Sequence, residues 1–168
     1  MVAGLDGIDR KILGLLREDG RMPHATIAKE VGLSAPAVHE RVRKLEQRGI
    51  IAGYHAVIDP TLMDRDHVAF IQVTLADGEE FAIDDPIVAR ICEESDVLEF
   101  HRIAGQDCYL VKVRTGTNKD LEQLLRRIRM IHGVSRTRTT MVLSTELEKP
   151  SIEVPAEQTS VEAPSAQA

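Results

Sequence analysis

Residues 23–51 hold two short helical patterns joined by a tight turn, and this feature limits the possible folds more than any other. Pro23 can open a helix from His24 to about Val31, which Gly32 ends, because glycine tolerates the left-handed cap conformation. Ser34 can cap a second helix that runs to about Arg48. Two short helices joined by a glycine-containing turn predict a helix-turn-helix.

The second of these helices has an apolar face and a polar face. On a helical wheel Val38, Val42 and Leu45 fall together and are expected in the core. The residues expected to point away are Pro36, Glu40, Arg43 and Lys44, with His39 and Arg41 on the flanks. In a helix-turn-helix this helix enters the major groove of DNA. The pattern alone leaves a second interpretation open, a solvated helix face in which Glu40 and Lys44 pair across one turn.

A third helix is predicted ahead of this motif. Asp6 is a suitable N-cap, and Asp9 suits the positive end of the helix dipole. Ile8, Ile12, Leu15 and Leu16 follow one stripe of the helix, which predicts that they face the core. Gly20 lies where the helix is expected to end. Residues 1–52 are therefore predicted to form a helix-turn-helix DNA-binding domain.

The charge distribution agrees with a nucleic-acid-binding face in this half. The chain of 168 residues has a net charge of −6, but residues 1–55 hold nine Lys and Arg against seven Asp and Glu. The rest of the chain is acidic, and residues 150–168 contain three Glu and no basic residue. A protein that is acidic overall and basic in one part suits binding of DNA by one face only.

The second half alternates between strand and helix patterns. Residues 53–66 are predicted as a linker, with a strand from Gly53 to Ile58 and a turn at Asp59-Pro60. The predicted elements then run strand 68–75, helix 83–94, strand 97–104, hairpin 105–107, strand 108–114, a helix capped by Thr117 or Asn118 and ending near Ile131, and strand 134–147. This order predicts a ferredoxin-like βαββαβ domain over residues 67–149, and hence an α+β protein.

Two further expectations follow from the second half. Two helices cover only one face of such a sheet, so a second copy of the chain is expected on the other face. Residues 150–168 contain three Pro and three Glu without basic residues, which is typical of a disordered tail.

Several classes of protein lack support in the sequence. No apolar run approaches the ~20 residues of a membrane span, and the N-terminus has no signal-peptide pattern, so a cytoplasmic protein is expected. Cys92 and Cys108 form no CxxC, and the His residues are scattered, so neither a disulfide nor a metal site is predicted. No nucleophile-base pair or phosphate loop can be assembled, so an enzyme is not expected and no cofactor is predicted.

The chain resembles the Lrp/AsnC family of transcription regulators, also called feast/famine regulators, over residues 5 to about 147. The residues that carry the resemblance are Leu5-Asp6-x-x-Asp9-Arg10-Lys11-Ile12-Leu13, Asp19-Gly20-Arg21, Leu33-Ser34, Val38-x-x-Arg41-Val42-x-Lys44-Leu45-Glu46, Gly49-Ile50-Ile51 and Gly53-Tyr54. The resemblance implies a winged-helix-like DNA-binding domain and a C-terminal effector domain (RAM domain) that dimerises and senses amino acids or related metabolites. It also implies higher even-numbered homo-oligomers, often tetramers or octamers, and a nucleoid-associated cytoplasmic protein.

The same resemblance places the helix-turn-helix at about His24 to Arg43 and the recognition helix at Ser34 to Lys44. Arg41, Arg43 and Lys44 would contact phosphates, and Ser34 at the helix start can bind another. The candidates for reading bases are His39, Glu40, Ala35, Pro36 and Ala37. For Arg41 an intramolecular ion pair is the alternative, and for His39 a purely solvated position. A dimer that presents two such helices predicts a palindromic site on double-stranded DNA.

The effector region departs from the family pattern. The family commonly has Gly-x-x-Asp-Tyr between the two middle strands, whereas this chain has Gly105-Gln106-Asp107-Cys108-Tyr109. A thiol cannot anchor an amino group as a carboxylate can. Either the effector differs or backbone groups near Gly105 and Thr139-Thr140 take a larger part; a tight turn with a small buried cysteine is a further alternative. The sequence thus predicts a sequence-specific, effector-responsive regulator, with an effector-independent architectural DNA-binding protein as the alternative.

Overall fold

The computed structural model describes residues 4–76, 86–104, 109–149, 151–152 and 154. The chain divides into two compact units. The first contains the residues up to Val57 together with those from Lys149 onward, and the second spans Ile58–Glu148. Each unit has its own hydrophobic core, so the two are described separately below.

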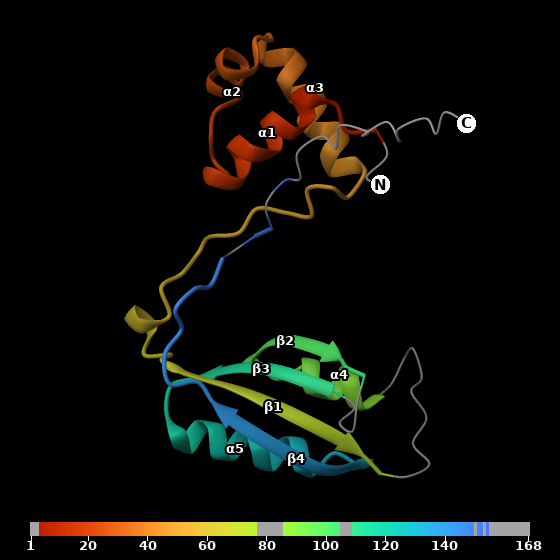
Figure 1. The fold of residues 1–168 in the computed structure, drawn as a ribbon, viewed down its shortest axis with the longest axis vertical. Helices are drawn as coiled ribbons and strands as arrows, with labels where there is room; N and C mark the ends of the chain where they lie inside the picture. Colours follow the sequence, from red (N-terminus) through yellow and green to blue (C-terminus); the bar gives the residue numbers. More distant parts are fainter. Residues whose placement is uncertain (1–3, 77–85, 105–108, 150, 153, 155–168) are drawn as a thin grey trace, which may run out of the picture. The chain divides into compact units, whose positions relative to one another are not determined.

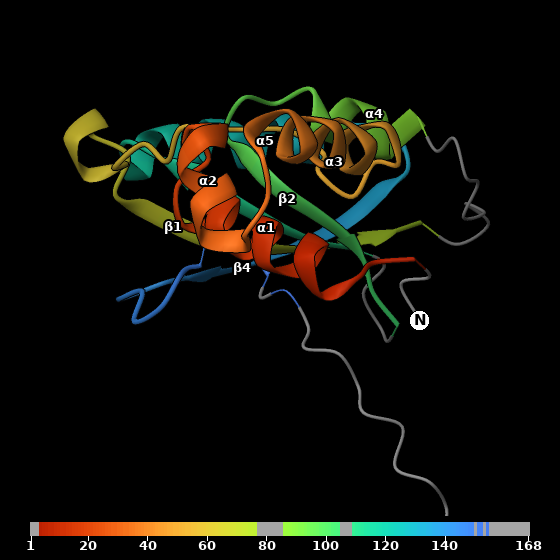
Figure 2. The same cartoon turned by 90° about the horizontal axis from the view of Figure 1, so that it is seen from above.

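The first unit contains three helices, α1 (Gly7–Glu18), α2 (His24–Val31) and α3 (Ala35–Gln47). Figure 2 presents them from a second side. The Asp6 carboxylate accepts the Asp9 N–H at 2.7 Å, and the Asp9 carboxylate accepts the Asp6 N–H, so the predicted N-cap is a capping box. α1 ends at Glu18 with Asp19 as its C-cap, one residue before the predicted Gly20.

The helix-turn-helix follows the predicted pattern closely. α2 ends at Gly32, whose φ of 71° is the left-handed conformation that glycine adopts at little cost. The Ser34 hydroxyl accepts the Ala37 N–H and begins α3. Ile12, Val38 and Leu45 are fully or almost fully buried, and each helix contributes to the core. The described residues of this unit form no strand, so they do not include the wing that the family resemblance implied.

The second unit is a four-stranded antiparallel sheet with strand order β2-β3-β1-β4. Its elements are β1 (His67–Leu75), α4 (Pro86–Cys92), β2 (Val97–Arg102), β3 (Tyr109–Thr115), α5 (Asn118–Arg129) and β4 (Val134–Met141). Thr117 is the N-cap of α5, as expected. The order is the ferredoxin-like βαββαβ arrangement.

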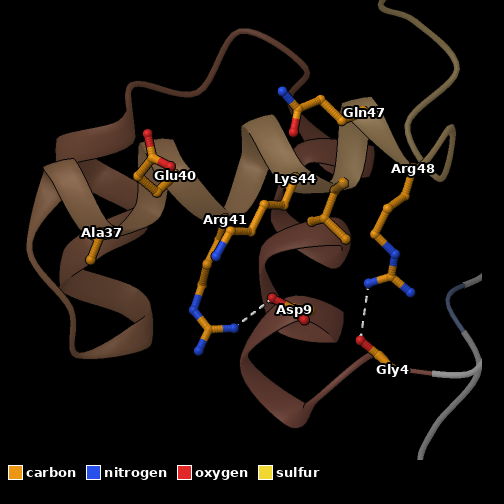
Figure 3. Close-up of a pocket in the computed structure, with 9 residues that line it drawn as sticks. Gly4, Asp9, Ala37, Glu40, Arg41, Lys44, Gln47 and Arg48 are labelled. Carbon is orange, nitrogen blue, oxygen red and sulfur yellow. Dashed lines mark hydrogen bonds and ion pairs between the residues drawn. The ribbon is translucent and has the colours of Figure 1, made fainter.

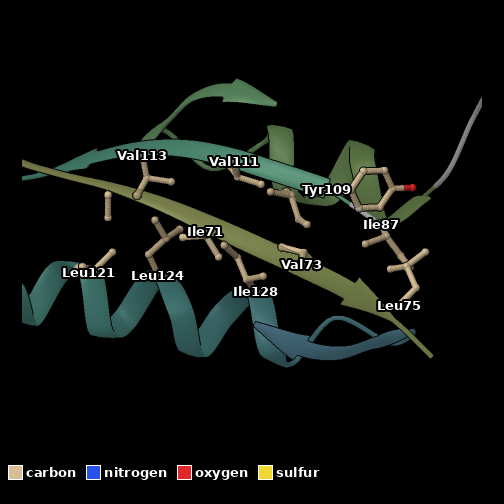
Figure 4. Packing of buried hydrophobic residues seen from close by; sticks show 12 residues of the cluster. Ile71, Val73, Leu75, Ile87, Tyr109, Val111, Val113, Leu121, Leu124 and Ile128 are labelled. Atoms are coloured by element: carbon tan, nitrogen blue, oxygen red, sulfur yellow. The ribbon is translucent and has the colours of Figure 1, made fainter. Parts of the chain in front are cut away.

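Both helices pack on one face of this sheet. Alternate residues of β1 and β3 point toward them, among them Ile71, Val73 and Val111, all with no exposed surface. Leu124 of α5 (Figure 4) is also fully buried in the same cluster, and so is Ile91 of α4. The apolar residues that recur every second position in the strands and about every 3.6 positions in α5 therefore pack into one core.

The opposite face of the sheet, here called the open face, is covered by no helix among the residues that the structure describes. It presents Phe70, Gln72, Leu110, Lys112, Arg114, Arg138 and Thr140. Glu148, beyond the end of β4, contacts two of these residues. Its carboxylate accepts hydrogen bonds from the Lys112 ammonium and, at 3.0 Å, from the Arg114 guanidinium. Glu148 therefore pairs with both Lys112 and Arg114 on the open face.

Two strand predictions are wrong. Residues 53–58 form no strand, because no described backbone pairs with them; a turn of 3₁₀ helix follows at Thr61–Met63. β4 ends at Met141, and not at Leu147. Its neighbour β1 begins at His67, and the Val142 N–H donates to the Val68 carbonyl. Beyond Val142, β1 has no further residues with which β4 could pair. Alternation alone does not reveal where a neighbouring strand begins.

The predicted helix at 83–94 is described only from Pro86, because residues 77–85 lie outside the described residues. The hairpin at 105–107 and the first residue of the predicted strand 108–114 also lie outside them.

Candidate nucleic-acid interface and effector region

The faces of α3 are those that the helical wheel predicted. Val38, Val42 and Leu45 are buried, with at most 4% of their surface exposed. Pro36, Glu40, Arg43 and Lys44 are exposed, and so are Ser34 and His39. Ala35 and Ala37 are half-buried, and Ala35 packs against the core of the unit. The candidate contact residues therefore lie on α3 and its N-cap, and Ala35 is the one that packs against the core.

Arg41 is held by an ion-pair cluster at the start of α1. Its guanidinium donates to the carboxylates of Asp6 and Asp9, both at 2.7 Å (Figure 3 draws the bond to Asp9). The Asp9 N–H, then Arg41, lower the pKa of the Asp6 carboxyl below its ordinary value. The intramolecular ion pair that was the alternative for Arg41 is therefore present. A phosphate contact by the same side chain stays a prediction.

The other two cations of α3 differ in their surroundings. Arg43 donates to the Glu40 carboxylate one turn earlier at 3.1 Å, and both side chains are 53% exposed. Such an exposed pair contributes little stability and is easily exchanged for another anion. The Lys44 ammonium has no ion-pair or hydrogen-bond partner among the described residues. Arg43 and Lys44 are thus the cations of α3 that are most available to a phosphate.

A hollow of about 500 Å³ lies between α3 and the start of α1. Figure 3 labels most of the residues that line it: Gly4, Asp9, Ala37, Glu40, Arg41, Lys44, Gln47 and Arg48. The Arg48 guanidinium donates to the Gly4 carbonyl at 3.0 Å, which ties the end of α3 to the N-terminal segment. We name this the α1-side hollow. It contains cations and carboxylates together.

A second hollow, of about 290 Å³, lies on the other flank of α3, next to α2. We name it the α2-side hollow. Its lining includes Arg21, His24, His39, Arg43, Glu46 and Tyr54. The rings of His24 and His39 lie beside each other in this lining, with centroids 5.4 Å apart and planes tilted by 49°. Sequence reasoning missed Arg21 and His24 as members of a site, because only the packing of α2 against α3 brings them to His39.

The effector region is only partly described. Gly105, Gln106, Asp107 and Cys108 lie outside the described residues. Thr139 and Thr140 are neighbours on β4 and point to opposite faces of the sheet. Thr140 is on the open face; the Thr139 hydroxyl is buried with no described hydrogen-bond partner.

The strand order separates these threonines from β3. β1 lies between β3 and β4, so the two strands are about 9.5 Å apart, or two strand spacings. Residues 105–108 immediately precede β3, whose first residue Tyr109 aligns across β1 with Thr137. Thr139 and Thr140, the two described candidates, therefore lie on different faces of a strand that does not pair with β3.

Two absences hold for the described part of the chain. Its helices include none of the length and apolar character that crossing a bilayer requires. No group of three or more potential metal ligands lies together in it, and Cys92 is exposed and free of a disulfide.

Comparison with protein families decides what kind of domains these are. The model of the AsnC-type helix-turn-helix domain matches residues 5–46, and that of the Lrp/AsnC ligand binding domain matches residues 68–152. The chain belongs to the Lrp/AsnC family. It is a transcriptional regulator and not an enzyme, with a helix-turn-helix domain followed by a ligand-binding domain.

The regulator is similar to individual relatives over most of its length. It is 38% identical over 145 residues to the HTH-type transcriptional regulator LrpA of Mycobacterium tuberculosis, covering 86% of this chain and 94% of that protein. It is 34% identical to the regulator FL11 of Pyrococcus horikoshii over 144 residues, or 86% and 93% of the two chains. The feast or famine regulatory protein of M. tuberculosis complexed with L-methionine has a similar structure, with a TM-score of 0.81 and 36% identity over 90% of this chain and 100% of that one.

Proposed function

We propose that the regulator binds specific sequences in double-stranded DNA through the outward face of α3. The observation that carries this proposal is the pair of cations at Arg43 and Lys44, exposed on the second helix of the helix-turn-helix. His39, Glu40, Pro36 and Ala37 lie on or beside the same face and are the candidates for base contacts. Ser34, at the N-terminus of α3, is placed to bind a phosphate.

Alanine at both Arg43 and Lys44 tests the phosphate contacts. The slope of log K against log salt, measured with a mixed-sequence duplex, should become shallower by about 2, because each lost phosphate contact removes ~0.9. Arg41 is left out, since its replacement also removes the partner of Asp6 and Asp9. The control, Arg90→Ala with Lys119→Ala, removes the same charge from the second unit and should leave the slope unchanged. An unchanged slope in the α3 variant would exclude both cations from the phosphate contacts.

We further propose that the regulator is a homodimer, and probes DNA with two copies of α3. The open face of the sheet supports this, because it combines Phe70 and Leu110 with polar residues and no described helix of its own chain covers it. A second chain on this face would give a two-fold axis and hence a palindromic binding site. Assembly to tetramers or octamers, in the cytoplasm and on the nucleoid, belongs to the same proposal.

The second unit is proposed to bind an amino acid or related metabolite. The support is the ligand-binding family model and the relatives whose structures contain L-methionine, one from M. tuberculosis and one, at 25% identity, from Neisseria meningitidis. The candidate residues stay Gly105, Gln106, Asp107, Cys108, Thr139 and Thr140.

One measurement distinguishes an effector-responsive regulator from the alternative, an architectural DNA-binding protein without an effector. DNA titrations repeated with each of the common amino acids should change the affinity or the assembly for at least one of them. No change with any amino acid would favour the architectural alternative.

A further inference from the structure

The two hollows lie on opposite flanks of α3. Taking Val38 at the centre of the buried face, His39, Arg43 and Glu46 project toward the α2 side, and Arg41, Lys44 and Arg48 project toward the α1 side. Pro36 lies between them on the outward face, and Glu40 and Gln47 lie at the edge of that face that borders the α1-side hollow. The outward face of α3 is thus a ridge with a cation-bearing hollow along each side.

This arrangement matches the cross-section of the major groove. A helix with its side chains is about 10–12 Å across, and the groove is about 12 Å wide. When α3 fills the groove, its two flanks face the two sugar-phosphate backbones. Each hollow then lies where a phosphate passes, and the groups that line it decide how that phosphate is bound.

The α2-side hollow differs from the α1-side hollow because two imidazoles line it. The two imidazoles of His24 and His39 are in contact with each other, and neither has a hydrogen-bond or ion-pair partner among the described residues. Histidine is the side chain that gains or loses charge in this pH range. The α1-side hollow has no histidine in its lining. A phosphate therefore meets a titratable pair on one flank of α3 only.

The other charged groups that line the α2-side hollow are two arginines and one glutamate. The Arg21 guanidinium has no described partner, and Arg43 has only its exposed pair with Glu40. The single carboxylate of the lining, Glu46, accepts the Tyr54 hydroxyl at 3.1 Å. Burial, and then this bond, raise the pKa of Tyr54, so its phenol stays neutral. Since Glu40 pairs with Arg43 and Glu46 lies in the lining, two carboxylates balance the two arginines, and a protonated histidine gives the hollow a net positive charge.

We propose that the α2-side hollow seats a phosphate of the DNA backbone between Arg21, His24, His39 and Arg43, and that DNA binding there takes up protons. The inference rests on the proposed DNA-binding function and adds two residues and a pH dependence to it. An anion beside an imidazole favours its protonated form. Each protonated ring is one more cation opposite the DNA and adds to the number of counterions released.

The test measures how the full-length regulator binds a labelled mixed-sequence duplex of about 30 base pairs, as a function of salt, at about pH 6 and pH 8. The slope of log K against log salt should be steeper at the lower pH by about 1 to 2, at ~0.9 for each histidine protonated. In the double variant His24→Gln, His39→Gln this difference between the two pH values should disappear. Calorimetry in two buffers of different ionisation enthalpy should show proton uptake by the wild type and less by the variant.

Two further variants separate this site from general effects of pH. His55→Gln replaces an exposed histidine of the same unit that does not line the hollow, and it should keep the full pH difference. Arg21→Gln should make the slope shallower by about 0.9 at both pH values, because it removes one permanent charge. Equal slopes at the two pH values in the wild type, or a pH difference that survives in the double histidine variant, would overturn the inference. A wild type that binds no duplex at either pH would overturn the proposed function with it.

Discussion

At the scale of single residues, Arg41 illustrates what sequence reasoning can and cannot decide. Its position on the wheel predicted a flank of α3, and the structure confirms that position. Its partners are Asp6 and Asp9, more than thirty residues earlier in the chain. The spacing of residues along α3 does not show whether an arginine there binds a phosphate or pairs with a carboxylate that is distant in the sequence. The same holds for His24 and Arg21, whose place beside His39 depends on how α2 packs against α3.

The Asp6–Arg41 pair predicts a pH dependence of stability. The folded-state pKa of Asp6 lies below its ordinary value of 3.8, so its ionised form stabilises the fold above that value and the benefit is lost as the pH falls below it. Asp6→Asn should therefore lower the Tm of the first unit by about 2–4 °C at pH 5 and above, as expected for an exposed pair of roughly 0.5 kcal/mol. Circular dichroism melts should show this gap closing as the pH falls below 3.8.

The control is Asp66→Asn, which changes an exposed carboxylate with no described ion pair. It should show no gap that depends on pH. A gap for Asp6→Asn that is constant down to strongly acidic pH would mean that the Asp6 charge does not stabilise this unit.

At the scale of elements, caps and periodicities were sufficient for most of the fold. Asp6, Ser34 and Thr117 each begin the helix that the sequence assigned to them, and Gly32 ends α2. These signals are local, because each acts on backbone groups within one turn. The strand predicted at 53–58 and the extension of β4 to residue 147 were wrong, because a strand depends on a neighbour that its own sequence does not specify.

Replacing Gly14 in α1 by alanine is predicted to raise the stability of the first unit. Gly14 lies in the helix interior, and a Cβ built there meets nothing within 4 Å. Gly14→Ala should stabilise the first unit by about 0.5–1 kcal/mol, because alanine loses less backbone entropy than glycine in a helix. Thermal melts should show a higher Tm.

Gly32→Ala is the matched comparison for this prediction. The same change there should destabilise by about 1 kcal/mol, because a φ of 71° is strained for any residue with a Cβ. A decrease in Tm for Gly14→Ala would contradict the account of α1.

At the scale of the whole molecule, the order of the two domains could be predicted because each has its own apolar pattern and forms its own core. The effector region could not be predicted to the same depth. Thr139 and Thr140 point to opposite faces of β4, and β1 separates that strand from β3. A pocket assembled from separate strands depends on how the strands align with one another, and one assembled from separate chains depends on the symmetry of the oligomer. Residue types alone specify neither.

The central claim is that two copies of α3 read a specific DNA sequence, and selection of binding sites from a random-sequence duplex pool tests it most directly. The full-length regulator should enrich a palindromic motif whose half-sites are centred about 10–10.5 base pairs apart, or a multiple of that spacing, since a two-fold dimer presents its helices on one side of the duplex. The double variant Arg43→Ala, Lys44→Ala should enrich it weakly or not at all. Binding without any enriched sequence, or enrichment of a single unpaired half-site, would contradict the account.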